Sequence, residues 1–136
     1  MLDDDFDALW NRACRWDSPA VRTHEGDAAL HVALTFHGSV VNGGLFDAVQ
    51  NHREDPEHPL PRVLQAYRFL GLDDVAATVD AARRRHEELA PTPDDEARWG
   101  AAEEQVDASC VLDDEGLGAA ARAAVRARPH SFAPLG

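Results

Sequence analysis

Lysine is absent from this sequence of 136 residues, and cysteine is almost absent. The 13 basic residues are therefore all arginines, a bias that a GC-rich genome explains together with the many alanines. The two cysteines, Cys14 and Cys110, form no Cys-x-x-Cys pair, which argues against a disulfide framework or a zinc site of that type. Both lie in stretches with helical spacing, so we expect each to be a small buried hydrophobic side chain.

Long apolar runs and catalytic motifs are also lacking. No run approaches the ~18 residues that span a bilayer, and the start from Met1 to Asp5 has no basic and apolar regions of a signal peptide. We therefore expect a cytoplasmic protein that does not associate with membranes. There is no Gly-x-Ser-x-Gly, Walker or HExxH motif, so we expect no enzymatic activity, no catalytic residue, no bound metal and no cofactor.

What the chain has in excess is acid. It carries 25 acidic against 13 basic residues, a formal net charge of -12. Such a chain is repelled by nucleic acids and by anionic membrane surfaces, so we expect no direct nucleic-acid binding. The length and the 44% apolar content suit one globular domain over residues 1–136. Basic protein surfaces are the natural partners of a chain like this.

The acidic residues are concentrated in one segment. Residues 87–115 contain eleven acids and a single base, Arg98. Acids in the first turn of a helix complement the helix dipole, and a charged face keeps a small protein in solution. A partner-binding surface is the alternative interpretation. Its candidate residues are Asp94, Asp95, Glu96, Glu103, Glu104, Asp107, Asp113, Asp114 and Glu115.

Apolar residues recur at helical spacing almost throughout, and no stretch alternates with the period of a strand. The pattern predicts an all-α protein, a compact bundle of six to seven helices. The helices are expected at 3–14, 28–41, 45–51, 61–70, 73–89, 94–110 and 114–126. The helix at 28–41 is apolar nearly all round, which is typical of a helix in the middle of a bundle.

Caps and breaks define the ends of these helices. Gly71 and Pro129 are expected to end two of them, and Thr92 is expected to cap the helix that follows Pro93. On that helix a buried face is predicted, formed by Trp99, Ala102, Val106 and Cys110.

Asn42-Gly43-Gly44 should end the long helix, since Asn and Gly accept the left-handed backbone conformation that ends helices. The free N–H groups of such a junction can also hold an anion. A tight turn between two helices is the simpler interpretation.

Seven histidines raise the question of a metal or catalytic site. His24, His31, Thr35 and Asn42 would line one polar stripe if the long helix reached back to His24. A small enzyme or metal-binding protein that uses His24, His31 and Asn42 is therefore an alternative of a different class. Histidines that are exposed, or satisfied by internal hydrogen bonds, are the competing interpretation.

The Asn42-Gly43-Gly44 motif, followed by Asn51, resembles the bacterial family called domain of unknown function 4375, the family of DNA-mimic protein 19. The similarity extends over about residues 27–132. Leu45 stands where that family has Phe, and Asp47 where it has Gln. The resemblance implies an all-helical fold and no catalytic residues. It also implies a precedent in which acidic side chains occupy the DNA-binding surface of a regulator.

These observations predict an acidic protein-binding module whose partner is a basic protein, such as a DNA-binding regulator. An immunity-like or antitoxin-like inhibitor of a basic nuclease would use the same charge and is the alternative within this class.

Overall fold

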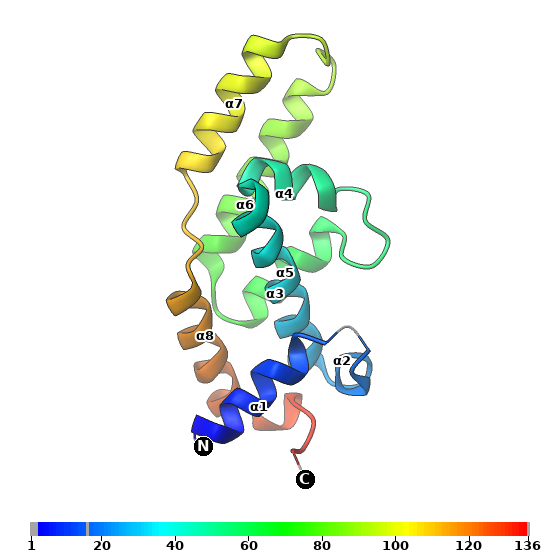
Figure 1. Ribbon diagram of the computed structural model, residues 1–136, viewed down its shortest axis with the longest axis vertical. Coiled ribbons are helices and arrows are strands. Elements are labelled where there is room, and N and C mark those ends of the chain that lie inside the picture. Colours follow the sequence, from blue (N-terminus) through cyan, green and yellow to red (C-terminus); the bar gives the residue numbers. More distant parts are fainter. Residues whose placement is uncertain (1–2, 16, 136) are drawn as a thin grey trace.

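The computed structural model describes residues 3–15 and 17–135. Four residues of the domain predicted over residues 1–136 lie outside the described residues, namely Met1, Leu2, Trp16 and Gly136. The described part of the chain contains eight α-helices, one short 3-10 helix and no strand, which confirms the all-helical class. Figure 1 shows them stacked along one long axis, with α1 and α8 at one end and the α6–α7 hairpin at the other.

The helix count is higher than predicted because α2, Pro19–Thr23, was not expected. With only five residues it is too short to display an apolar stripe, so periodicity does not detect it. The helices are α1 Asp3–Ala13, α2 Pro19–Thr23, α3 Glu25–Gly43, α4 Leu45–His52, α5 Leu60–Phe69, α6 Asp73–Leu89, α7 Glu96–Ala108 and α8 Asp114–Ala127, followed by the 3-10 helix η1 Pro129–Ser131.

Helix α3 runs through the middle of the molecule, as its apolar composition predicts (Figure 1). It contacts α1, α2, α4, α5 and α8. Leu30, Ala33 and Phe36 are almost fully buried on it. Near the end of the helix the apolar side chain of Val41 is 69% exposed. The helix therefore provides the surface on which most of the other helices pack.

The turn between α5 and α6 is a Schellman motif. Gly71 has a φ of +76°, and its N–H donates to the carbonyl of Arg68. The N–H of Leu72 donates to the carbonyl of Tyr67, so two orphan carbonyls of α5 are satisfied. This confirms Gly71 as the end of the helix. The buried stripe predicted for α6 is also confirmed, and consists of Val75, Val79, Ala82, His86 and Leu89.

Helix α7 pairs with α6 and also contacts α4. Its cap is Asp95, whose side chain accepts from the N–H of Arg98, so the prediction that Thr92 is the cap was wrong. Thr92 instead accepts, through its carbonyl, a 2.8 Å hydrogen bond from the Trp99 indole.

The predicted face of α7 is correct only in part. Ala102 and Val106 are buried, whereas Trp99 is half-buried and Cys110 lies beyond the end of the helix. The ring of Trp99 packs against the rings of Phe46 on α4 and His86 on α6.

Segments near the two ends of the described chain pack together. Asp27 on α3 is 1% exposed, and its carboxylate accepts from the Arg12 guanidinium at 2.8 Å and from the Ala133 N–H at 2.8 Å. Arg12 in turn donates to the carbonyl of Ala133.

The predicted burial of Cys14 was wrong, because α1 ends at Ala13 and the side chain of Cys14 is exposed.

Candidate acidic interaction surface

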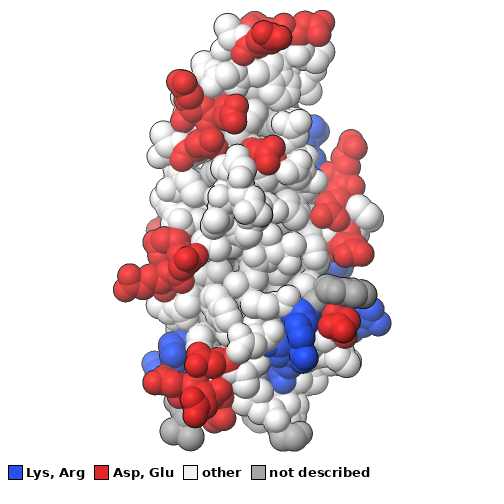
Figure 2. Space-filling view, in the orientation of Figure 1, with Lys and Arg blue, Asp and Glu red and all other residues white. Residues whose placement is uncertain are grey.

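Eight of the nine candidate carboxylates are exposed, and only Asp107 is partly buried. They belong to the turn before α7, to α7 itself and to the start of α8. Figure 2 shows separate clusters of acidic side chains along the edge that α7 and α8 occupy in Figure 1, with uncharged surface between them. The acidic surface is therefore a series of clusters along the long axis.

Four of the nine carboxylates have partners within the protein. Asp95 and Asp113 are the N-caps of α7 and α8, where their side chains accept from the N–H groups of Arg98 and Gly116. Acceptance of these N–H groups satisfies orphan donors of each helix start. Asp114 lies against Nε2 of the buried His37, although its own side chain is 89% exposed.

Asp107 holds two distant segments together. Its Oδ1 accepts a 3.0 Å hydrogen bond from the N–H of Phe46, in the first turn of α4. The carboxylate thus lies at the positive end of that helix dipole. Neutralisation of Asp107 would therefore remove a contact at the point where α7 meets α4.

The remaining five carboxylates have no such role. Asp94, Glu96, Glu103, Glu104 and Glu115 are exposed and form no hydrogen bond or ion pair through their side chains with any residue that the structure describes. We call these five residues the free acidic set. Their negative charge is turned toward solvent without internal compensation.

Helix α6 provides the contrast. Asp80 is within 2.8 Å of Arg83 and 3.3 Å of Arg84, and the Arg83 hydrogen bond lowers the pKa of Asp80 below its ordinary range. Glu87 and Glu88 pair with Arg83 and Arg85 at 2.8 and 3.2 Å. Asp80, Glu87 and Glu88 of α6 are thus neutralised by arginines of the same helix, whereas residues 87–115, which include α7, contain a single base, Arg98.

The Asn42-Gly43-Gly44 motif forms the junction against which Asp107 docks. Gly44 has φ +90° and ψ 167°, a conformation that is essentially restricted to glycine. Its nearest neighbour is the Asp107 carboxylate, 2.7 Å from the position a Cβ would occupy. Gly43 is the last residue of α3, and among the described glycines only Gly44 and Gly71 have positive φ. The motif therefore ends the helix as predicted, but Gly44 combines its positive φ with an extended ψ and is not in the left-handed helical conformation that was expected.

Asp47 and Asn51 complete this junction. The Asn51 amide donates to Oδ2 of Asp47 at 3.2 Å, and that carboxylate lies over the backbone of Gly43. The roles of Asp47 and Asp107 were missed, because nothing in the sequence indicates that α7 packs on the start of α4.

The histidine stripe does not converge on one site. His24 precedes α3 in an extended conformation and contacts the Thr23 hydroxyl, while Asn42 is exposed near the far end of that helix. At ~1.5 Å per residue, about 27 Å separates them along the axis. His31 lies between them and is bound to the carbonyl of Ala13 at 2.7 Å. In residues 3–15 and 17–135, no three His, Cys, Asp or Glu side chains are grouped as metal ligands.

None of the described helices is both long enough and apolar enough to cross a membrane. Comparison with curated proteins and with solved structures gave no significant match to this chain. Residues 22–124 match the profile of the family described as DMP19-like protein. The match begins a few residues before the region expected from the resemblance, residues 27–132, and it ends a few residues before the end of that region. It covers most of the chain, which therefore belongs to the DMP19-like protein family.

Proposed function

We propose that this protein binds a basic protein surface through the free acidic set, in the manner of a DNA mimic. The observation that carries the proposal is the uncompensated charge of Asp94, Glu96, Glu103, Glu104 and Glu115. On the neighbouring helix α6, by contrast, Asp80, Glu87 and Glu88 are paired with arginines. Exposed acids without internal partners set up a field that steers a basic partner. Membership of the DMP19-like family is consistent with such a role.

The spacing of the carboxylates also suits this role. Glu96 and Glu103 are seven residues apart on α7, which places them on one face and about 10.5 Å apart along the axis. The rigid helix thus holds two uncompensated charges at a fixed separation on one face, an arrangement that suits a pair of basic side chains on a partner.

The test compares two variants of equal net charge. The first neutralises the free acidic set with Asp94→Asn, Glu96→Gln, Glu103→Gln, Glu104→Gln and Glu115→Gln, which changes the formal charge from -12 to -7. The control removes five other exposed acids without ion pairs to described residues, namely Asp4, Asp7, Asp17, Glu54 and Asp74. Both variants should fold, and the first should melt slightly higher if repulsion along α7 is relieved.

Partners are captured on the immobilised parent protein from a lysate of its source cells at low salt and are then identified. Affinity for the purified partner should fall at least tenfold for the free-set variant and stay near the parent for the control. It should weaken as ionic strength rises, and duplex DNA should compete with the parent for the same partner.

Each failure has a distinct meaning. An equal loss of affinity in both variants would show that only the net charge matters. No loss of affinity in either variant would show that binding does not depend on these carboxylates. Loss of binding without competition by DNA would leave an acidic binding module and reject mimicry. Inhibition of a recovered nuclease would identify the inhibitor alternative instead.

A further inference from the structure

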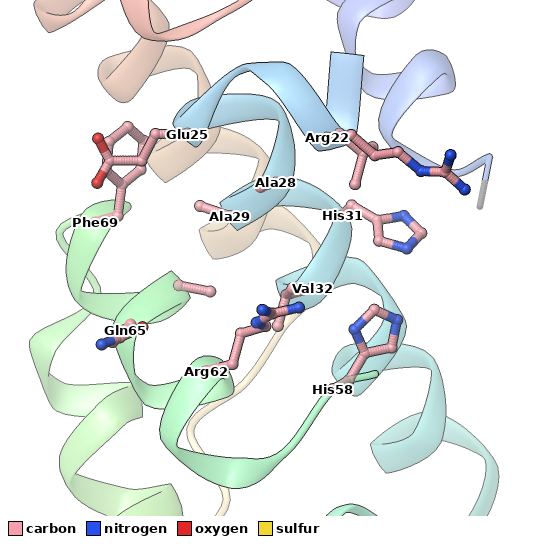
Figure 3. A pocket seen from close by; sticks show the side chains of 12 residues that line it. Arg22, Glu25, Ala28, Ala29, His31, Val32, His58, Arg62, Gln65 and Phe69 are labelled. Atoms are coloured by element: carbon pink, nitrogen blue, oxygen red, sulfur yellow. The ribbon is translucent and has the colours of Figure 1, made fainter. Parts of the chain in front are cut away.

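A second feature of the molecule is a cavity of about 460 Å³ between α2, α3, α5 and the loop before α5. Its size is within the ~300–1,000 Å³ typical of pockets for small molecules. The small apolar side chains of Ala28, Ala29 and Val32 form its middle, and polar groups lie on both sides (Figure 3). The residues that line it are Val21, Arg22, Glu25, Ala28, Ala29, His31, Val32, His58, Arg62, Gln65, Ala66 and Phe69.

The polar groups of the cavity are mostly basic, in a protein that is otherwise strongly acidic. Figure 3 shows Arg22, His31 and His58 on one side and the guanidinium of Arg62 next to Val32 in the middle, with Glu25 beside Phe69 on the other side. Neither guanidinium is ion-paired to a residue of the described chain. Arg62 is anchored by one hydrogen bond from Nη1 to the carbonyl of Glu57 at 3.0 Å, so its other N–H groups remain available.

The two imidazoles form the wall between the arginines. Their ring centroids are 5.1 Å apart in an edge-to-face arrangement. Nδ1 of His31 faces the carbonyl of Ala13, which can only accept, so that nitrogen carries the proton. In the neutral ring Nε2 of His31 is then an acceptor, and on protonation it becomes a donor.

His58 is less well satisfied than His31. Its Nδ1 is buried and has no hydrogen-bond partner among the described residues. Burial, reinforced by the proximity of His31, lowers the pKa of His58. An anion in the cavity would favour the protonated form of His58 and offset the effect of burial on that ring.

We propose that this cavity binds a small organic anion. Its carboxylate or phosphate group would lie among Arg22, Arg62, His31 and His58, and its apolar part would contact the wall that includes Val32 and Phe69. Arginine forms charge-assisted hydrogen bonds to both kinds of oxyanion. A pocket of this volume takes a small molecule rather than a nucleic-acid strand, and the negative field of the rest of the protein repels polyanions. The site is separate from the free acidic set.

Isothermal titration calorimetry of the full chain with benzoate, phenyl phosphate, inorganic phosphate and benzyl alcohol tests the proposal. At least one aromatic anion should bind with one-to-one stoichiometry, and the neutral alcohol should bind at least tenfold more weakly. Benzoate and phenyl phosphate together show which oxyanion is preferred. Shifts of the His31 and His58 ring protons in NMR spectra should accompany binding.

Arg62→Gln should weaken binding at least tenfold, and Arg22→Gln provides a second variant of the same kind. Arg68→Gln is the matched control, because Arg68 is exposed on the same helix and does not line the cavity. The variant that lacks the free acidic set should bind the anion as the parent does.

Several results would overturn the proposal. One is that neither benzoate nor phenyl phosphate binds. Another is that Arg62→Gln and Arg22→Gln, with melting temperatures like the parent, bind as Arg68→Gln does. Inorganic phosphate binding as tightly as phenyl phosphate would refute the apolar half of the site.

Discussion

Addition of a side chain at Gly44 should damage the junction between α3 and α4. For a residue with a Cβ, the backbone conformation of Gly44 costs ~1–3 kcal/mol. The new Cβ of Gly44→Ala would lie 2.7 Å from Oδ2 of Asp107, so the carboxylate must move away. That movement would weaken its 3.0 Å hydrogen bond with the N–H of Phe46.

A hydrogen bond to a charged group contributes about 1.5–3 kcal/mol, and the partial exposure of Asp107 favours the lower end. Together with the backbone term this gives a loss of about 3 kcal/mol in the free energy of unfolding. For a domain of this size the melting temperature should fall by about 10 °C.

Two other glycines serve as controls. Gly38 is an exposed residue inside α3 with no atom within 4 Å of the position that a Cβ would occupy, so Gly38→Ala should stabilise the protein by about 0.5–1 kcal/mol. Gly71 also has open space around it but a φ of +76°, so Gly71→Ala isolates the backbone cost of about 1–2 kcal/mol.

A double-mutant cycle separates strain from the lost contact. In an Asp107→Ala background, Gly44→Ala should cost only the backbone term, because no carboxylate remains to be displaced. Urea unfolding followed by tryptophan fluorescence measures all the variants, and Trp99 beside α4 reports on the junction. If Gly44→Ala unfolds at the same urea concentration as Gly38→Ala, or if the cycle shows no coupling, this account of the junction is wrong.

Two further predictions concern buried charge. Asp27→Ala should lower the free energy of unfolding by about 3 kcal/mol, because it leaves the mostly buried Arg12 without its counter-charge. Asp17→Ala removes an exposed carboxylate and is the control. A loss for Asp27→Ala no larger than that for Asp17→Ala would contradict this prediction. Burial and the guanidinium of Arg53 lower the pKa of His86 in the folded protein below its ordinary value of 6.5. Below pH 6.5 the unfolded chain therefore binds more protons than the folded protein, and the free energy of unfolding should fall as the pH drops. His86→Phe should flatten this dependence in urea titrations at several pH values, and an unchanged slope would show that His86 is not the group responsible.

The features of the fold that the sequence predicts are local ones. The helical period and the position of Gly71 depend on residues within a few turns of each other, and the stripe of α6 from Val75 to Leu89 was correct throughout. The unexpected helix α2 and the early end of α1 before Cys14 lie where elements are short and the pattern is weak.

The candidate site could be predicted only as a segment of charge. Which acids in it are free depends on contacts between distant residues, such as the one between Phe46 and Asp107, which are 61 positions apart. The anion cavity illustrates the same limit, because Arg22, His31, His58 and Arg62 come from separate segments that share no motif. Both features arise from how the helices pack.

The buried pair of Asp27 and Arg12 has a consequence for the order in which the protein folds. A chain leaving the ribosome presents α1 and α3 long before the Ala133 N–H that completes the shell of the Asp27 carboxylate. Until then this end of α3 also lacks the ring of Phe132, which lies directly over Gly26. The packing of this end of α3 thus depends on residues that are synthesised long after α3 itself, and a chain truncated before Phe132 should keep the α6–α7 end folded while the α1–α3 contact is loosened.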